Sequence, residues 1–397
     1  MISRGVKVTI AGSMINLFIG TFYSWSVFAD GLISQLNWTR TEASLPYTVE
    51  VLVFAMMMVV AGRFQDRIGA RKGAMVSGLL IGTSFILCAL FPVPTGLTLF
   101  FGVMFGTGAA FGYAAVTPAA MKWFPPKKRG LVTGFVVMSL GAGSLFWPPI
   151  INAMIAKYGV VHTFFLWGIL LMVGILVMTR FISEPENGFA GNSKIGPSLK
   201  MDWKRIITNP TFILLWLMMG LAAGTGLMIV GHLVQIAELD FQVEAGFMLV
   251  SFFALFNTGG RFSGGLITDC IGYRKALFIA FFLTLCSMLL YLGTGSWPGL
   301  LLGTILLGFS YGSLFTAFPA AIEKLFGLND FGSHYGLLVT ALGIGGSIGP
   351  FLAGSMADLY GSYYPAMILG IGASLLALAL LFVLKHISHK ESYKPVS

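Results

Sequence analysis

Residues 256–275 of this 397-residue chain read FNTGGRFSGGLITDCIGYRK. Arg261 stands inside a stretch that is otherwise uncharged and apolar enough to read as a membrane-spanning helix, and Asp269 and Arg274 mark the end of that helix. A cation at membrane depth costs several kcal/mol unless it is paired or hydrated, so such residues usually have a function. The stretch therefore predicts a functional Arg261; the structural alternative is a snorkelling side chain or an ion pair.

The second half of this stretch repeats an earlier segment of the chain. Residues 61–72 read AGRFQDRIGARK and residues 264–275 read GGLITDCIGYRK, at an offset of 203. The identical residues are the pairs Gly62 and Gly265, Asp66 and Asp269, Gly69 and Gly272, Arg71 and Arg274, and Lys72 and Lys275. Parallel repeats of this kind are typical of transporters built from two related halves, with the substrate site between them.

The composition is that of a membrane protein. Hydrophobic residues make up 56% of the chain and charged residues 10%, whereas soluble domains carry about 25% charged residues. The three cysteines, Cys88, Cys270 and Cys286, lack metal-ligand spacing, and no glycine run ends in the Gly-Lys-Ser/Thr of a phosphate loop. We therefore expect no metal, no cofactor, no ATPase activity and no enzyme.

Apolar stretches of about 20 residues, long enough to cross a bilayer, recur along the whole chain. They predict twelve spans at 6–28, 44–62, 73–92, 95–121, 130–157, 162–182, 211–237, 244–268, 275–294, 298–325, 335–360 and 364–385. The predicted fold is an all-α membrane protein with two pseudo-symmetric six-helix bundles, 1–182 and 211–397, joined by a polar linker, 183–210. The first span lacks the order of a cleaved signal peptide, so we expect it to be kept.

The positive charges predict the orientation. With twelve spans, 21 of the 24 lysines and arginines fall on the side of the N-terminus, two (Arg40 and Lys157) fall on the other side, and Arg261 lies in between. The positive-inside rule then places both termini and the linker in the cytoplasm. The net charge of +9 is explained by basic loops facing anionic lipid, so we expect no nucleic-acid partner.

The neighbours of Arg261 suggest what it binds. A guanidinium presents a planar fork that matches a carboxylate, and Asn257, four residues earlier, shares its helix face. Asn257 is interpreted either as a substrate ligand or as a residue that forms a structural hydrogen bond between helices. Under the offset of 203, Arg261 corresponds to Met58 and Asn257 to Phe54, so a cation in one half faces an apolar wall in the other. This asymmetry suits a small anion with a short apolar end.

Two further titratable residues lie within predicted spans. Glu50 is a carboxylate well inside span 2, which indicates a proton carrier or a gate; the alternative is that the span begins later and Glu50 is hydrated. His232 lies within the predicted seventh span, 211–237. It is a second proton-carrier candidate, and the alternative is a hydrogen-bonded structural histidine.

The segment from Gly62 to Lys72, with its partial repeat, resembles the cytoplasmic signature of the major facilitator superfamily. A narrower resemblance, to the oxalate/formate antiporter and monocarboxylate transporter branch, rests on Tyr23-Ser24-Trp25, on the Lys122–Pro125 and Lys128–Leu131 segments, and on Phe256, Asn257 and Arg261. The resemblance implies a secondary transporter that works by alternating access. The signature residues, expected to stabilise one conformation through a charge network, are Gly62, Asp66, Arg67, Gly69, Arg71, Asp269 and Arg274.

The resemblance also implies an aromatic anion cage, carried over to Tyr23, Tyr113, Tyr311 and Phe315. The oxalate antiporter pattern has a second cation in span 11, seven residues after a Tyr-Gly pair, and that place is Leu342 here. One buried cation balances one carboxylate, and a second carboxylate would stay uncompensated. The expected substrate is therefore a monocarboxylate that resembles lactate, pyruvate or acetate.

Proton-coupled symport by a monomer in the inner (plasma) membrane of a prokaryote is the expected function, with the carboxylate, membrane lipid and protons as partners. Two alternatives stay open. One is exchange of anions of the oxalate/formate type. The other, from a different class, is a membrane receptor that keeps the fold without moving solute.

Overall fold

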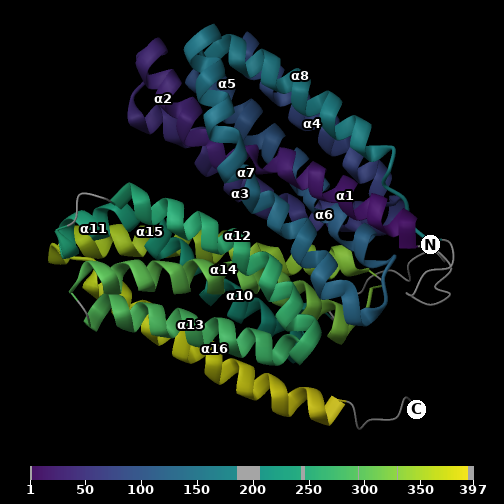
Figure 1. Cartoon of the computed structure of the whole chain (residues 1–397), viewed down its shortest axis with the longest axis vertical. Helices are drawn as coiled ribbons and strands as arrows, with labels where there is room; N and C mark the ends of the chain where they lie inside the picture. The colour runs from purple at the N-terminus through teal and green to yellow at the C-terminus, as the bar shows by residue number, and fades with distance from the viewer. Residues whose placement is uncertain (1, 186–205, 243–245, 294, 329, 392–397) are drawn as a thin grey trace. The chain divides into compact units, whose positions relative to one another are not determined.

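A computed structural model describes residues 2–185, 206–242, 246–293, 295–328 and 330–391. Within these ranges the regular elements are all helices (Figure 1). The chain divides into two compact units, Met1–Leu199 with Ile322–Leu337, and Lys200–Ala321 with Leu338–Ser397. Most of the predicted linker, 183–210, lies outside the described residues, so the boundaries of the two bundles stay a prediction.

The first unit is built from the N-terminal helices. They are α1 (Ile2–Ile19), η1 (Gly20–Ser24), α2 (Trp25–Leu36), α3 (Arg40–Ile68), α4 (Ala70–Leu90), α5 (Pro94–Leu97), η2 (Thr98–Phe105), α6 (Gly106–Met121), η3 (Pro126–Lys128), α7 (Arg129–Tyr158) and α8 (Val160–Thr179).

The second unit is built from the C-terminal helices. They are α10 (Pro210–Val230), α11 (Leu233–Phe241), α12 (Gly246–Ile271), α13 (Tyr273–Gly293), α14 (Trp297–Phe326), α15 (Phe331–Tyr360) and α16 (Tyr364–Glu391). The end of α14 and the first two turns of α15, residues 322–337, belong to the first unit.

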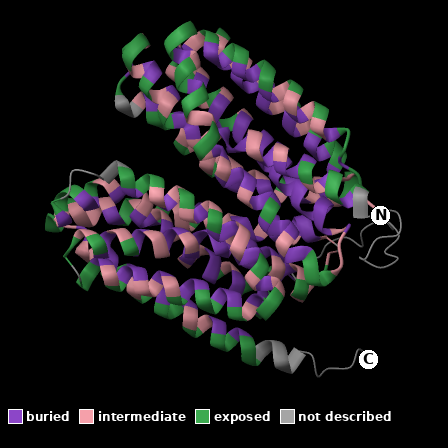
Figure 2. Ribbon diagram, in the orientation of Figure 1, coloured by how far each residue is buried: buried purple, intermediate pink, exposed green. Residues whose placement is uncertain are grey.

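The helices have the length and hydropathy of membrane spans. Eleven helical stretches among the described residues meet both criteria. The eighth predicted span, α12, has 26 residues and is not among the eleven, because Asn257, Arg261 and its glycines lower its hydropathy. Figure 2 shows buried positions where helices of one unit pack together and exposed positions on their outer faces, which carry large apolar side chains such as Val173 and Phe282. The predicted all-α membrane class is confirmed.

Three predicted spans contain a change of helix type or a break. Span 1 contains the 3₁₀ segment η1, and span 4 contains the π-helix η2. Span 7 breaks at Gly231 and His232, between α10 and α11. Apolar composition marks a span but does not distinguish α from 3₁₀ or π geometry, and π segments often lie at functional sites.

The two copies of the repeat end their helices in the same way. Gly69, between α3 and α4, has φ +98°, and Gly272, between α12 and α13, has φ +81°. A positive φ is readily adopted only by glycine, so the repeat is visible in the backbone as well as in the sequence. The helix α3 runs on to Ile68 rather than ending near Gly62 as predicted, because its polar residues were read as a loop.

Candidate functional site

Arg261 is buried in α12, with 1% of its surface exposed. Its Nε donates a hydrogen bond of 3.1 Å to Oδ1 of Asn257. The four-residue spacing therefore places both side chains on one helix face, as predicted. Because the amide oxygen of Asn257 engages Nε, the orientation of the guanidinium plane is fixed from within its own helix.

An aromatic cluster from α14 covers the guanidinium. Cζ of Arg261 lies 4.4 Å from the ring centroid of Phe315, within the range of a cation–π interaction. The ring of Tyr311 meets Phe315 edge-on, with centroids 5.2 Å apart, and Phe253 of α12 lies 6.1 Å from Tyr311. Two predicted cage residues, Tyr311 and Phe315, are thus brought together beside Arg261.

Three glycines, which we call the glycine seam (Gly260, Gly308 and Gly312), allow α14 to approach α12 this closely. A Cβ on Gly308 would lie 2.8 Å from the carbonyl oxygen of Phe253, and a Cβ on Gly312 would overlap the carbonyl oxygen of Asn257. The hydroxyl of Ser313 donates to the carbonyl of Gly260 over 3.2 Å. The seam holds Phe315 at contact distance from Arg261, and small residues are the usual means of close helix packing in membranes.

Leu342 lies in the part of α15 that belongs to the second unit, where it is half-buried. That Leu342 stands where the oxalate antiporter pattern has its second cation stays a prediction.

Tyr311 has a second close contact. Its ring packs against Gly226 of α10 so closely that a Cβ on Gly226 would overlap it.

In the first unit, Tyr113 of α6 is buried and pairs with Tyr335 of α15. Their hydroxyl oxygens lie 3.3 Å apart, and Phe54 meets the ring of Tyr113 edge-on at 5.9 Å. Tyr335 was missed as a site candidate, although the Tyr335-Gly336 pair is visible in the sequence. Tyr23, the other predicted cage residue of the first unit, lies in the 3₁₀ segment η1, and its ring centroid is 3.9 Å from that of Phe22.

Glu50 is buried in α3, with 2% of its surface exposed. Its Oε2 has no hydrogen-bond partner among the described residues. Because α3 already begins at Arg40 and Glu50 is buried, the structure does not favour the alternative of a hydrated Glu50 ahead of the span; its role as proton carrier or gate stays a prediction.

His232 occupies the break between α10 and α11. One ring nitrogen, Nε2, lies 3.0 Å from the carbonyl oxygen of Pro350, and the other, Nδ1, lies 3.2 Å from the hydroxyl of Tyr363. The backbone N–H of Tyr363 donates to Asp240; burial and then the nearby Asp358 and Asp240 raise the pKa of the Tyr363 hydroxyl. These contacts favour the structural alternative for His232, and its proton role stays a prediction.

Asp66 of the signature caps the start of α15. Its carboxylate accepts hydrogen bonds from the backbone N–H groups of Gly332 at 3.1 Å and Ser333 at 2.7 Å. A carboxylate is favourable at a helix N-terminus, and Gly62 lets α3 come close, since a Cβ there would overlap the carbonyl of Gly332. Asp66 therefore binds backbone amides rather than a basic side chain.

The remaining charged residues of the signature do not take part in the contact between Asp66 and the start of α15. Arg67 and Arg71 are exposed, and Nε of Arg274 donates to the hydroxyl of Tyr273 over 3.1 Å, while Asp269 is half-buried in α12. An ion pair that the sequence reading missed joins Arg129 and Glu323 within the first unit. The available signal was an acid near the end of span 10 and a base at the start of span 5.

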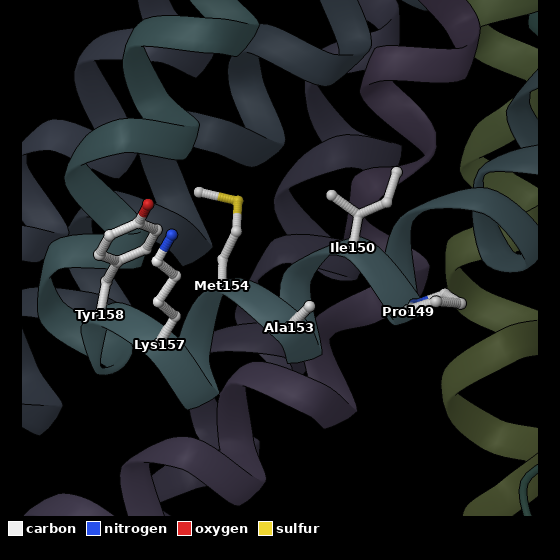
Figure 3. A pocket seen from close by; sticks show the side chains of 6 residues that line it. All are labelled: Pro149, Ile150, Ala153, Met154, Lys157 and Tyr158. Carbon is white, nitrogen blue, oxygen red and sulfur yellow. The ribbon is translucent and has the colours of Figure 1, made fainter.

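No group of three His, Cys, Asp or Glu side chains that suits a metal ion occurs in the described ranges. A pocket of about 450 Å³ lies on α7 and is lined by Pro149, Ile150, Ala153, Met154, Lys157 and Tyr158 (Figure 3). Its lining comes from one helix and includes none of the predicted site residues, so we do not assign it to the substrate.

Comparisons with known proteins agree with the fold. A sequence profile of the Major Facilitator Superfamily matches residues 10–267 and 242–396. The oxalate:formate antiporter of Oxalobacter formigenes is 24% identical over 386 residues, which cover 95% of this chain and 90% of that protein. Monocarboxylate transporter 13 of Bos taurus is 23% identical over 381 residues, covering 91% and 84%. A crystal structure of the Escherichia coli fucose:proton symporter superposes with a TM-score of 0.72 at 15% identity, covering 95% and 98%.

Proposed function

The chain belongs to the Major Facilitator Superfamily, whose members are transporters, and on this premise we propose that it is a secondary active transporter of a small monocarboxylate. The observation that carries the proposal is a fully buried arginine, Arg261, held by Asn257 and covered by Phe315. The similarity to an oxalate:formate antiporter and to a monocarboxylate transporter supports the substrate class.

The chemistry of the proposed site follows from the geometry of Arg261. Asn257 engages Nε, and the planar fork of the guanidinium matches a carboxylate. Such forked, charge-assisted pairs are the strong hydrogen bonds of proteins. Phe315 and Tyr311 limit access of water to one face of the pair, which strengthens the attraction because it lowers the local dielectric constant. Tyr113 and Tyr23 remain the predicted contributions of the first unit.

The charge count of the site predicts selectivity. We expect Leu342→Lys to raise transport of oxalate relative to lactate, because a second cation compensates the second carboxylate, whose burial otherwise costs several kcal/mol. Competition by oxalate against radiolabelled lactate in proteoliposomes measures the shift, and Leu342→Met is the volume-matched control. An unchanged oxalate-to-lactate ratio in Leu342→Lys contradicts the charge-balance argument.

Coupling is proposed to be proton symport, with anion exchange as the second candidate. An interior-negative potential opposes uptake of a monoanion by about 2.3 kcal/mol per 100 mV. A co-transported proton removes this cost, and so does exchange of one monoanion for another. Uptake driven by a pH gradient into liposomes without internal anion supports symport, whereas uptake only into preloaded liposomes supports exchange.

We further propose that the monomer lies in the inner membrane of a prokaryote with both termini in the cytoplasm.

Binding itself is tested by ligand-dependent stability, because only a ligand that binds the native state raises it. We expect lactate, pyruvate or acetate to raise the melting temperature of the purified protein more than oxalate does. Sulfate at matched ionic strength is the control for general salt effects. Stabilisation without any uptake into liposomes would favour the receptor alternative, and no stabilisation by any monocarboxylate contradicts the proposed substrate class.

A further inference from the structure

Glu50 differs from the other buried or half-buried carboxylates of the described chain in lacking a compensating group. Asp66 accepts two backbone hydrogen bonds, Glu323 pairs with Arg129, and Glu184 pairs with Lys122. Oε2 of Glu50 has no hydrogen-bond partner in the part of the chain that the structure describes, although only 2% of the residue is exposed.

The backbone of α3 is closely packed at Glu50. Two glycines, Gly102 in the π-helix η2 and Gly106 at the start of α6, face α3 at this level. A Cβ on Gly106 would lie 2.9 Å from the carbonyl oxygen of Glu50, and a Cβ on Gly102 would lie 2.8 Å from Cγ1 of Val49. The backbone of α3 therefore rests directly on η2 and α6 at the level of Glu50, where the span changes from π to α geometry.

The neighbouring elements supply little charge to Glu50. Among the elements packed on α3, η2 and α5 carry no titratable side chain, and Tyr113 is the only one on α6. Asp30 on α2 is exposed, and Cys88 on α4 is buried. On α3 itself, Tyr47 lies one turn before Glu50.

The remaining charges of this region lie away from Glu50. The described basic and acidic side chains of α3 and α4 that follow it are at the helix ends, in Arg63, Asp66, Arg67, Arg71 and Lys72. The contact between α15 and α3 at Met58 and Gly336, two turns beyond Glu50, brings His334 and Tyr335. None of these groups is hydrogen-bonded to Oε2 of Glu50.

We infer that Glu50 is the proton-binding site of the transport cycle. Its side chain is a neutral carboxylic acid while it is buried, and it releases the proton when water reaches the carboxyl group. An isolated carboxylate in an apolar interior neutralises by binding a proton rather than staying charged. The inference rests on the proposed function for the identity of the co-transported anion. The positive charge of one proton bound to Glu50 cancels the negative charge of one carboxylate bound to Arg261, so loading the protein with both adds no net charge.

The first test separates net uptake from exchange. We expect Glu50→Gln to lose lactate accumulation driven by an imposed pH gradient, because its side chain binds no proton, while lactate exchange by the wild type without a gradient reports the substrate separately. Glu50→Asp, which still titrates, is expected to retain gradient-driven accumulation. Gradient-driven accumulation by Glu50→Gln equal to that of the wild type overturns the inference, while absence of any lactate exchange in the wild type overturns the proposed substrate instead.

A second measurement reads the proton directly and does not depend on the substrate. Difference infrared spectra of the purified protein between acidic and alkaline buffer are expected to show a protonated carboxylic C=O band that is absent in Glu50→Gln and displaced in Glu50→Asp. If Glu50→Gln does not fold, the displacement in Glu50→Asp decides the question. A band that is identical in the wild type and in Glu50→Asp overturns the assignment.

Discussion

Arg261→Lys protein is expected to bind lactate roughly 10- to 100-fold more weakly than the wild type, because the loss of a charge-assisted hydrogen bond costs about 1.5–3 kcal/mol. Lysine keeps the positive charge but replaces the rigid fork with a single ammonium on a flexible stem. It also loses the planar contact with Phe315 and the hydrogen bond from Nε to Asn257 that orient the arginine. Charge alone therefore does not restore the geometry.

The measurement is lactate affinity by ligand-dependent melting, together with uptake into proteoliposomes. Arg180→Lys is the matched control, because Arg180 is an exposed arginine at the end of α8, and we expect it to bind as the wild type does. The melting temperature without ligand tests whether Arg261→Lys still folds. If a folded Arg261→Lys or Arg261→Ala protein transports lactate at the wild-type rate, Arg261 is not the carboxylate-binding residue.

The features of the fold and of the site that could be predicted from the sequence depend on local spacing. Arg261 and Asn257 are four residues apart on one helix, so their contact follows from helix geometry. The two positive-φ glycines, Gly69 and Gly272, follow from the repeat and from the conformational range of glycine. Glu50 is buried, and its role as a proton carrier or gate stays a prediction.

The part that was not predictable depends on contacts between distant segments. Phe315 was expected in an aromatic cage, but its position over the guanidinium depends on how closely α14 approaches α12. The partners of Asp66 are backbone amides 266 and 267 residues away, which no charge pattern identifies. The breaks at η1, η2 and residues 231–232 lie within continuous apolar runs, where hydropathy carries no information on helix type.

The glycine seam gives the second large prediction, because it holds the aromatic cover on Arg261. We expect Gly312→Ala to reduce lactate binding and uptake about tenfold or more and to lower the melting temperature, since overpacking of this kind typically costs about 1–3 kcal/mol. The new methyl group would overlap the carbonyl oxygen of Asn257 and would lie 2.9 Å from the backbone nitrogen of Arg261. These are backbone atoms, so the strain is relieved by moving α12 and α14 apart, which moves Phe315 away from the guanidinium.

Gly259→Ala is the control that separates this geometry from a general effect of alanine. Gly259 lies on α12, two residues before Arg261, and a Cβ there meets no atom within 4 Å. Alanine is favoured over glycine within a helix by about 0.5–1 kcal/mol, so we expect Gly259→Ala to be as stable as the wild type or more stable, with unchanged uptake. If Gly312→Ala and Gly259→Ala bind lactate equally well, close contact between α12 and α14 is not what positions the binding arginine. If only Gly312→Ala loses binding while the unliganded protein remains folded, the distance between these two helices sets the affinity of the site.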